Sequence, residues 1–469
     1  MSADIEDSIL PGLFAPVIDW MRSSDLRMIV GTMVGIYLLF ALFSVLLVPL
    51  NQLLGGLIST FQRVTFLAAV YALVVLALNL HWGYTGLFNI GVAGFMAVGV
   101  YTMAMLAAPP TANPPGLGVP MLVASMVPIA PGVGHFIGLL VTITLGMLAA
   151  AIVGALTAIP AFRLRADYLA IVTIALSEII RLSLLSRTLQ TFTLPGIGIE
   201  LGTGAGRGIG LPTNPVRAIF YNDPNDTAAG VTPIGEVLFG FADAIGVGDS
   251  IVVSWTYTLF LIGVVIAVYW LLVRIGNSPF GRVLKAIRED EEVAQSLGKN
   301  TRLVKVKVFM VGCALMGLAG ILWEGSKGFT DPTSTTFLPL QTFYIFIALI
   351  IGGSGSNTGS VLGGALFAGL LFEGPLFVTR ILREYLVIGT IPDTFAAALG
   401  ELFILNPVPL LAYGIDNISP LRFVLIGILL ILLMQRRPEG LLGHRTETAA
   451  SIDLSDRSTA TPEDGESDE

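Results

Sequence analysis

The sequence predicts an all-α membrane protein, a polytopic helical bundle of about ten transmembrane helices with short re-entrant or interfacial segments. Hydrophobic residues make up 54% of the 469 positions and charged residues only 12%, which is more apolar surface than a soluble core can bury. Apolar runs of about 20 residues, the length that crosses a bilayer as a helix, recur along the chain. These runs are continuous rather than alternating, which favours helices over a β-barrel.

The candidate spans and the segments between them define the expected organisation. The spans lie near residues 28–49, 61–80, 86–108, 135–160, 167–186, 250–274, 304–325, 338–352, 359–378 and 420–434. Residues 119–130 and 394–405 are too short or too closely flanked by proline to span, so we expect interfacial or re-entrant pieces there. The single cysteine, Cys313, lies within an apolar run and is expected in the core.

Basic residues predict the orientation, because connections rich in Lys and Arg stay in the cytoplasm. The loop 275–303 and its flanks are basic, as is the turn holding Arg163 and Arg165, whereas the long loop 188–249 is acidic and expected outside. Alternating spans then place both termini in the cytoplasm and the chain in the plasma membrane. We expect an N-terminal cytoplasmic or interfacial segment (1–27), a transmembrane domain (28–443) and a disordered acidic tail (444–469).

The sequence offers little for enzymatic chemistry. It contains no G-x-x-x-x-G-K-[ST] and no H-E-x-x-H, so neither P-loop hydrolysis of a nucleotide nor this type of zinc site is predicted. The acidic run "REDEE" (288–292) is compatible with a metal site or with a solvated helix face. Neighbouring helical residues point about 100° apart, which favours the helix face. We therefore expect no enzyme activity, no metal and no cofactor.

The stretch "GRVLKAIREDEEVAQSLGKN" (281–300) is charged within an otherwise apolar chain. Ser278 and Pro279 can begin one helix, and Asp290 can cap a second short helix that Gly298 ends. A basic stripe (Arg282, Lys285, Arg288) suits lipid headgroups, and Val293, Ala294 and Leu297 form a small apolar face. The segment is either a connector or a docking surface for a soluble partner, and its length and caps favour docking.

Two regions share a pattern that indicates an internal repeat of the kind found in transporters. "GYTGLFNIGVAGFMAVG" (83–99) and "GGSGSNTGSVLGGALFAG" (352–369) each place a glycine-rich turn before a helix of small residues. Gly83 and Gly86 in the first turn are the candidates for an unwound segment of a translocation pathway.

Polar residues at membrane depth are the other pathway candidates. Glu178 and Arg181 lie one helical turn apart and can form an ion pair that is either structural or part of a gate. Asn79 and Asn89 can bond across helices or contact a zwitterionic substrate, and helix packing is favoured. A stand-alone ion-coupled carrier would need more intramembrane carboxylates than Glu178 alone.

Several motifs together resemble the LivM-type permeases of branched-chain amino acid ABC transporters. They are "LALNLHWGYTGLFNIGVAGFMAVGVY" (76–101), residues 281–323, "ALIIGGSGSNTGSVLGGAL" (348–366) and "RRPEGLLG" (436–443). The resemblance implies a permease subunit in the lipid bilayer, two separate ABC ATPase subunits, a homologous second permease and an extracytoplasmic substrate-binding protein, with no nucleic-acid partner.

The resemblance also assigns roles to residues. A coupling helix that docks on the ATPase is implied for Arg288, Glu289, Asp290, Glu291, Ala294, Leu297 and Gly298. The chain departs from the family in "NIGVAGF", where Asn89 and Val92 stand at positions that often hold Ser and His. This departure leaves urea or short amides as an alternative substrate class.

Overall fold

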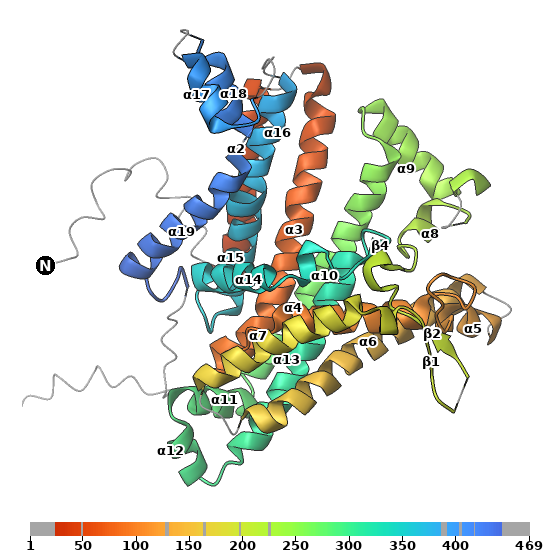
Figure 1. Cartoon of the computed structure of the whole chain (residues 1–469), viewed down its shortest axis with the longest axis vertical. Coiled ribbons are helices and arrows are strands. Elements are labelled where there is room, and N and C mark those ends of the chain that lie inside the picture. The colour runs from red at the N-terminus through yellow and green to blue at the C-terminus, as the bar shows by residue number, and fades with distance from the viewer. Residues whose placement is uncertain are drawn as a thin grey trace, which may run out of the picture.

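The structure, a computed structural model, describes residues 24–47, 50–126, 131–162, 166–196, 198–223, 227–385, 392–402, 406–416 and 418–442. Most of the expected N-terminal segment, the basic turn at Arg163 and Arg165, and the expected acidic tail lie outside these residues. The chain folds as a helical bundle with only two small two-stranded sheets among the described residues (Figure 1).

The predicted all-α membrane architecture is confirmed. Within the described ranges, seven helical stretches are long and apolar enough to cross a membrane. They are α2 (Asp25–Leu47), α3 (Leu50–Thr85), α6 (Pro131–Ala161), α7 (Ala166–Leu185), α10 (Asp249–Gly276), α13 (Thr301–Glu324) and the continuous α15 (Asn357–Leu366), η5 (Phe367–Glu373) and α16 (Gly374–Tyr385). The three other predicted spans fall on α4 (Val92–Ala107), α14 (Pro339–Gly352) and α19 (Ile418–Arg436), of which α4 has 16 residues and α14 has 14.

Shorter elements connect these helices. The two segments expected not to span contain α5 (Val119–Met126) and α17 (Phe395–Leu402), each of 8 residues. The remaining helices are α8 (Arg217–Phe220), α9 (Pro233–Ala244), α11 (Pro279–Glu289), α12 (Glu291–Ser296) and α18 (Val408–Asp416), with single turns η1 (Arg187–Leu189), η2 (Ala205–Arg207), η3 (Thr227–Ala229) and η4 (Thr335–Phe337).

The segment predicted as a long outer loop, 188–249, is folded rather than open. Strand β1 (Phe192–Thr193) pairs antiparallel with β2 (Glu200–Leu201). Strand β3 (Ile209–Gly210) pairs antiparallel with β4 (Phe329–Thr330), and Ile209 lies opposite Thr330. The second pairing ties this segment to the connection between α13 and α14.

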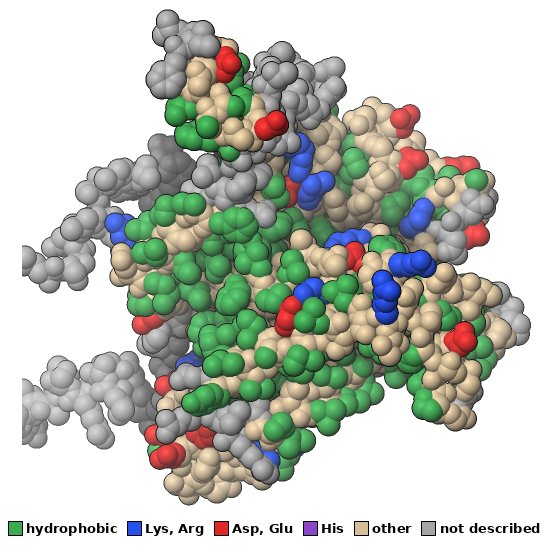
Figure 2. Space-filling model, in the orientation of Figure 1, with side chains coloured by type: hydrophobic (Ala, Val, Ile, Leu, Met, Phe, Trp, Pro, Cys, Tyr) green, Lys and Arg blue, Asp and Glu red, His purple; other side chains and the backbone are tan. Residues whose placement is uncertain are grey.

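Helix α3 runs through the middle of the bundle, and its residues 70–78 are buried (Figure 1). Close approach to α15 depends on glycine, because a Cβ at Gly364 would lie 2.7 Å from the backbone nitrogen of Ala72. On the outer surface of the bundle, hydrophobic side chains cover much of the face shown in Figure 2. This pattern of a packed centre and an apolar exterior is what a bilayer requires of a helical bundle.

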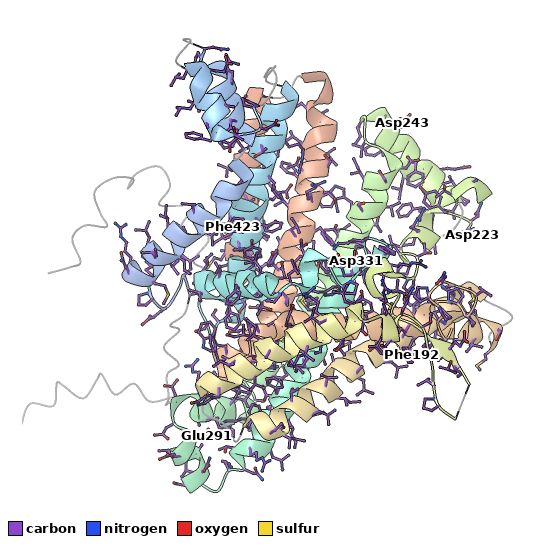
Figure 3. All side chains as sticks on the ribbon, viewed as in Figure 1. Phe192, Asp223, Asp243, Glu291, Asp331 and Phe423 are labelled. Carbon is purple, nitrogen blue, oxygen red and sulfur yellow. The ribbon has the colours of Figure 1, made fainter. Side chains whose placement is uncertain are left out.

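The connections gather at two ends of the molecule. One end carries α11 and α12, and we call it the α12 end; the other carries α8 and α9, and we call it the α9 end (Figure 1). Figure 3 labels Glu291 at the α12 end and Asp243 at the α9 end.

The close packing of α3 and α15 gives a test of the fold. We expect Gly364→Ala to lower the thermal unfolding temperature of the detergent-purified protein, because overfilling a packed core costs roughly 1–3 kcal/mol. Gly263→Ala on α10 is the matched control, since a Cβ there meets no atom within 4 Å. Equal unfolding temperatures for the two variants, followed by intrinsic fluorescence, would contradict the described helix contact.

Candidate functional site

The charged segment after α10 folds as the predicted helix pair. The Ser278 hydroxyl accepts a hydrogen bond from the Gly281 backbone N–H at 3.2 Å at the start of α11. The Asp290 carboxylate accepts bonds from the N–H groups of Glu292 (2.9 Å) and Val293 (3.0 Å) at the start of α12. Gly298, with a φ of 74°, follows the end of α12. The cap-forming residues identified in the sequence therefore set both helix starts.

The predicted apolar face of α12 is divided rather than compact. Ala294 is buried, whereas Val293 is 55% exposed and Leu297 is 73% exposed. Helix α12 has only 6 residues, so a single side chain reaches the bundle while its neighbours project into solvent. An ion pair between Glu291 and Lys305 of α13 holds α12 in this orientation.

Two members of the predicted basic stripe contact α3. The Lys285 ammonium lies 6.0 Å from the centre of the Tyr84 ring. The Arg288 guanidinium donates from Nη1 to the Gly83 carbonyl at 2.6 Å, and its Nη2 donates to Glu289 at 2.7 Å. Helical periodicity predicts the stripe but not the neighbours of each side chain, and contact of the stripe with lipid headgroups stays a prediction.

The two glycine-rich turns noted as a repeat lie against each other at the α12 end. The turn between α14 and α15 contains Gly355, whose N–H donates to the Asn79 side-chain oxygen at 2.8 Å. The Asn79 amide in turn donates to the Asn357 side-chain oxygen at 3.1 Å. These bonds confirm the prediction that Asn79 bonds across helices. We call the group Asn79, Gly83, Arg288, Gly355 and Asn357 the glycine junction.

The C-terminal described segment also packs here. The N–H groups of Leu441 and Leu442 donate to the carbonyls of Ile351 and Gly352, each at 3.0 Å. These carbonyls belong to the end of α14, where a helix leaves acceptors without partners in its own backbone. The conspicuous "PEGLL" sequence therefore has a structural role in capping α14.

The unwound segment begins at Gly86, not at Gly83. Gly83 lies within the last turn of α3, whereas Gly86 has a φ of 69° and starts a non-helical stretch that ends at Gly91. Protein side chains bond the exposed backbone: the Thr173 hydroxyl accepts from the Ile90 N–H at 3.0 Å. The Thr342 hydroxyl accepts from the Ala93 N–H at 3.2 Å. Such partners allow a broken helix at membrane depth.

Asn89 holds this stretch in place from a fully buried position. Its side-chain oxygen accepts from the Gly91 N–H at 2.9 Å, and its amide nitrogen lies 3.2 Å from His81 Nδ1. The His81 ring stacks on Phe309, with ring centres 4.7 Å apart. Sequence reasoning missed His81, because an isolated histidine carries no pattern that indicates its partners. Contact between Asn89 and substrate stays a prediction.

The predicted ion pair on α7 is confirmed. Arg181 donates from Nε and Nη2 to the two carboxylate oxygens of Glu178, at 2.9 and 2.5 Å. The Glu178 side chain is 35% exposed and the Arg181 side chain 15%. Helix α7 is not among the elements that meet at the glycine junction, so the five predicted pathway residues form separate groups. A role of the ion pair in a gate stays a prediction.

The sequence analysis treated Glu178 as the sole intramembrane carboxylate, but the structure places two more carboxylates within apolar helical stretches. Glu373, in the π-helical turn η5, is buried and lies 3.2 Å from Arg380 and 3.8 Å from Arg63. Glu324, also buried, accepts bonds from Thr330 and Lys327 at the end of α13. Both carboxylates were recognisable as charges inside apolar helices. Arg63 of α3 and Thr330 of β4 come from other elements, so these contacts also fix local packing.

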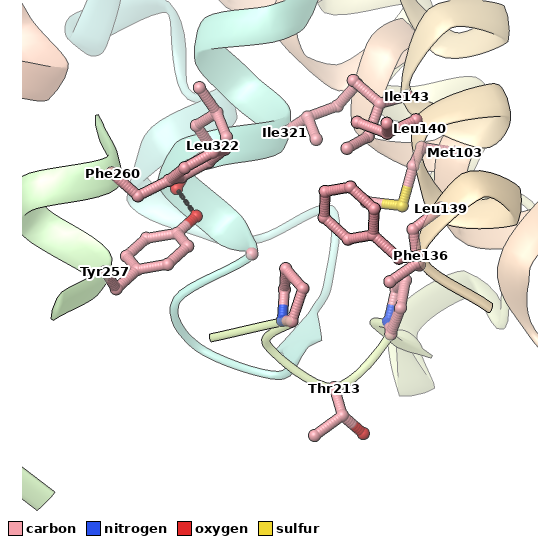
Figure 4. A pocket seen from close by; sticks show the side chains of 13 residues that line it. Met103, Phe136, Leu139, Leu140, Ile143, Thr213, Tyr257, Phe260, Ile321 and Leu322 are labelled. Atoms are coloured by element: carbon pink, nitrogen blue, oxygen red, sulfur yellow. Dashed lines mark hydrogen bonds between the residues drawn. The ribbon is translucent and has the colours of Figure 1, made fainter. Parts of the chain in front are cut away.

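A pocket lies between α4, α6, α10 and α13, toward their α9 end and beneath residues 212–215 (Figure 4). Its walls are apolar and include Met103, Phe136 and Phe260, and at its edge Tyr257 donates to the Leu322 carbonyl at 2.6 Å. None of the described lining residues is charged. The pocket therefore suits aliphatic groups but offers no ionic partner to a zwitterion.

Comparison with known proteins adds the family. The family model described as "Branched-chain amino acid transport system / permease component" matches residues 60–434, most of the chain. The chain belongs to this family. The matched range includes the glycine junction, helix α12 and both segments of the apparent repeat.

Individual relatives agree. The chain is 32% identical over 300 residues to "High-affinity branched-chain amino acid transport system permease protein LivM" of Escherichia coli (strain K12), a match covering 64% of the chain and 60% of that relative. It is 25% identical to the probable LivM of Methanocaldococcus jannaschii over 63% of the chain and 75% of that relative. The E. coli permease LivH is 32% identical over 101 residues, 22% of the chain and 32% of LivH.

The matches have limits in length. The aligned part of the chain spans about three fifths of the E. coli LivM protein. No solved structure matches the chain significantly. Within the family, the members named here are transport permeases by their descriptions and not enzymes, and the chain is a multi-pass membrane protein.

The Asp290 cap gives a test of the local structure of α12. We expect Asp290→Ala to cost about 1 kcal/mol of local stability, which corresponds to roughly five-fold faster amide hydrogen exchange across 291–297. Glu292→Ala, which removes a neighbouring acid but leaves the cap, serves as the control. Unchanged exchange in Asp290→Ala would show that the cap does not stabilise α12.

Proposed function

We propose that the chain is the transmembrane permease subunit of an ATP-driven importer of branched-chain amino acids, with ATP hydrolysed on partner subunits. The family match over residues 60–434 carries this proposal. The substrate is inferred from the descriptions of the relatives, and urea or short amides are the alternative that the departure at Asn89 and Val92 leaves for experiment.

In this proposal α12 docks on an ABC ATPase. Three features support it: a capped helix that stands out from the bundle, two exposed apolar side chains on it, and acidic groups beside them. Apolar residues presented on an exposed short helix favour insertion into a groove of a partner. The proposed coupling set is Arg288, Glu289, Asp290, Glu291, Ala294, Leu297 and Gly298. Within this set Arg288 bonds to Gly83 of α3, so we assign it to the membrane-domain side of the coupling rather than to the contact with the ATPase.

The orientation follows from the same assignment. ATPase subunits are soluble and use cytoplasmic ATP, so the α12 end faces the cytoplasm and the α9 end faces outward, with both termini inside. The Lys and Arg residues between Arg274 and Lys307 support this, because basic connections favour the cytoplasmic side. An extracytoplasmic binding protein would deliver substrate at the α9 end.

The importer would contain two ATPases and two permeases. The similarity to both LivM and LivH supports pairing with a homologous permease rather than a lone subunit. ATP binding would draw the ATPases together, move α12 and switch the bundle between outward-open and inward-open states. Gly83, Gly86, Asn89, Glu178 and Arg181 remain the proposed pathway residues. Of these, Glu178 and Arg181 offer opposite charges to a zwitterion.

Docking is tested with two residues of equal exposure at opposite ends. Leu297→Asp should weaken association with the ATPases by about 2 kcal/mol, roughly thirty-fold in Kd, because a central apolar anchor becomes charged. Val237→Asp on α9 is the control, since Val237 is 72% exposed and Leu297 is 73% exposed. Co-purification and titration with the ATPase measure both. Equal binding by the two variants would remove α12 from the interface.

The substrate is tested by uptake into proteoliposomes that hold the complete complex. We expect ATP-dependent accumulation of labelled leucine and no accumulation of labelled urea, because the named relatives are branched-chain amino acid permeases. Accumulation of urea alone would assign the alternative substrate. Uptake of leucine without ATP would indicate an ion-coupled carrier.

A further inference from the structure

We propose that Arg288 is the link through which movement of α12 reaches the two glycine turns, so that one guanidinium displaces the ends of α3 and α15 together. The inference rests on the proposed function, because it assumes that an ATPase moves α12. The inference addresses how movement of α12 is transmitted to the transmembrane helices. Docking of α12 on the ATPase does not by itself explain that transmission.

The position of Arg288 in the chain favours this role. It lies in the last turn of α11, two residues before Asp290, the residue that caps α12. Any displacement of the start of α12 is therefore carried directly into the backbone of Arg288. Its partly exposed side chain reaches the edge of the bundle, where Nη1 donates to the Gly83 carbonyl at 2.6 Å, while Nε and Nη2 donate to Glu289.

Three glycines lie around the arginine; Gly86 and Gly355 leave room beside its side chain, and Gly83 lets the end of α3 approach Gly355. A Cβ at Gly355, where φ is 90°, would lie 3.0 Å from Arg288 Nη1. A Cβ at Gly86 would lie 3.4 Å from Arg288 Cγ. At Gly83 a Cβ would lie 2.5 Å from the Gly355 backbone nitrogen. The arginine therefore contacts the end of α3, the start of the unwound stretch and the α14–α15 turn.

The bonds beyond Arg288 continue the connection. Gly355 is bonded through its N–H to Asn79 of α3, and Asn79 is bonded to Asn357 in the first turn of α15. The unwound stretch bonds to α7 through the Ile90 N–H and leads into α4, where the Ala93 N–H bonds to Thr342 of α14. Helix α3 ends and α15 begins at this group of atoms, and the stretch 86–91 leads from it into α4. A shift of the guanidinium therefore acts on α3 and α15 directly and on α4 through the unwound stretch.

Other contacts hold α11 in place without Arg288. Leu284 and Ile287 of α11 are buried, and Lys285 packs over the Tyr84 ring. The Glu291–Lys305 pair ties α12 to α13. Replacement of Arg288 should therefore leave the helix pair folded and able to dock, while removing the polar contact with the turns. This separates a role in transmission from a role in docking.

The test uses the complete complex in proteoliposomes, with leucine uptake and ATP hydrolysis followed together. Arg288→Gln should assemble with the ATPases and hydrolyse ATP, but leucine moved per ATP should fall about ten-fold, within the range of coupling between distant sites. Arg288→Lys should give an intermediate value, because an ammonium lacks the planar fork of guanidinium. Arg282→Gln, an exposed position on the same helix, should match the unaltered complex.

Gly355→Ala provides an independent variant on the other side of the contact. It should lower leucine transport per ATP as Arg288→Gln does, while ATPase association stays unchanged. Normal transport per ATP in Arg288→Gln would overturn the proposal, and so would loss of ATPase binding in that variant, which would make Arg288 a docking residue. If the unaltered complex hydrolyses no ATP or moves no leucine, the proposed function fails rather than this link.

Discussion

The bundle depends on bonding the backbone where its helices are interrupted. In hydrocarbon, each unsatisfied N–H or C=O costs several kcal/mol, so a broken helix persists only where protein supplies partners. The stretch 86–91 and the turn 353–356 are such breaks. N–H groups within them bond to side chains of Asn79 and Thr173, and the N–H of Ala93 in the first turn of α4 bonds to Thr342. These partners come from α3, α7 and α14. The breaks and the arrangement of the helices therefore determine each other.

Polar contacts near both ends join α3 and the α15–η5 helix into one antiparallel pair. At one end Asn79 bonds to Asn357 at 3.1 Å, and toward the other end Arg63 lies 3.8 Å from Glu373. Arg63 precedes Asn79 by as many residues as Glu373 follows Asn357. Between these polar contacts the helices approach closely at Gly364. The pair is thus joined by polar contacts at two points 16 residues apart on each helix, and a shift imposed at one end is carried along its length.

The sequence predicted the local features well and the tertiary ones poorly. Ser278 and Asp290 cap the two helices and Gly298 follows the end of the second, as predicted. These features were predictable because each involves residues only a few positions apart in the chain. Arg288 and Gly83 are 205 positions apart, and Gly355 and Asn79 are 276 apart, so periodicity gave no sign of either contact. For the same reason, the sequence did not predict that Ala294 is buried while Val293 and Leu297 are exposed. A helical pattern does not indicate which side of the helix meets the bundle.

The packing of Cys313 has a practical consequence for spectroscopy. It is the only cysteine of the 469-residue chain, and it is fully buried. A Cβ at position 154 would lie 2.7 Å from its sulfur, so the glycine there is what leaves room for the thiol. A maleimide or nitroxide reagent cannot reach a thiol enclosed between α6 and α13 while the bundle stays folded. A cysteine introduced on the surface would then react alone, so fluorescent or paramagnetic probes can be attached at chosen sites without first removing the native thiol.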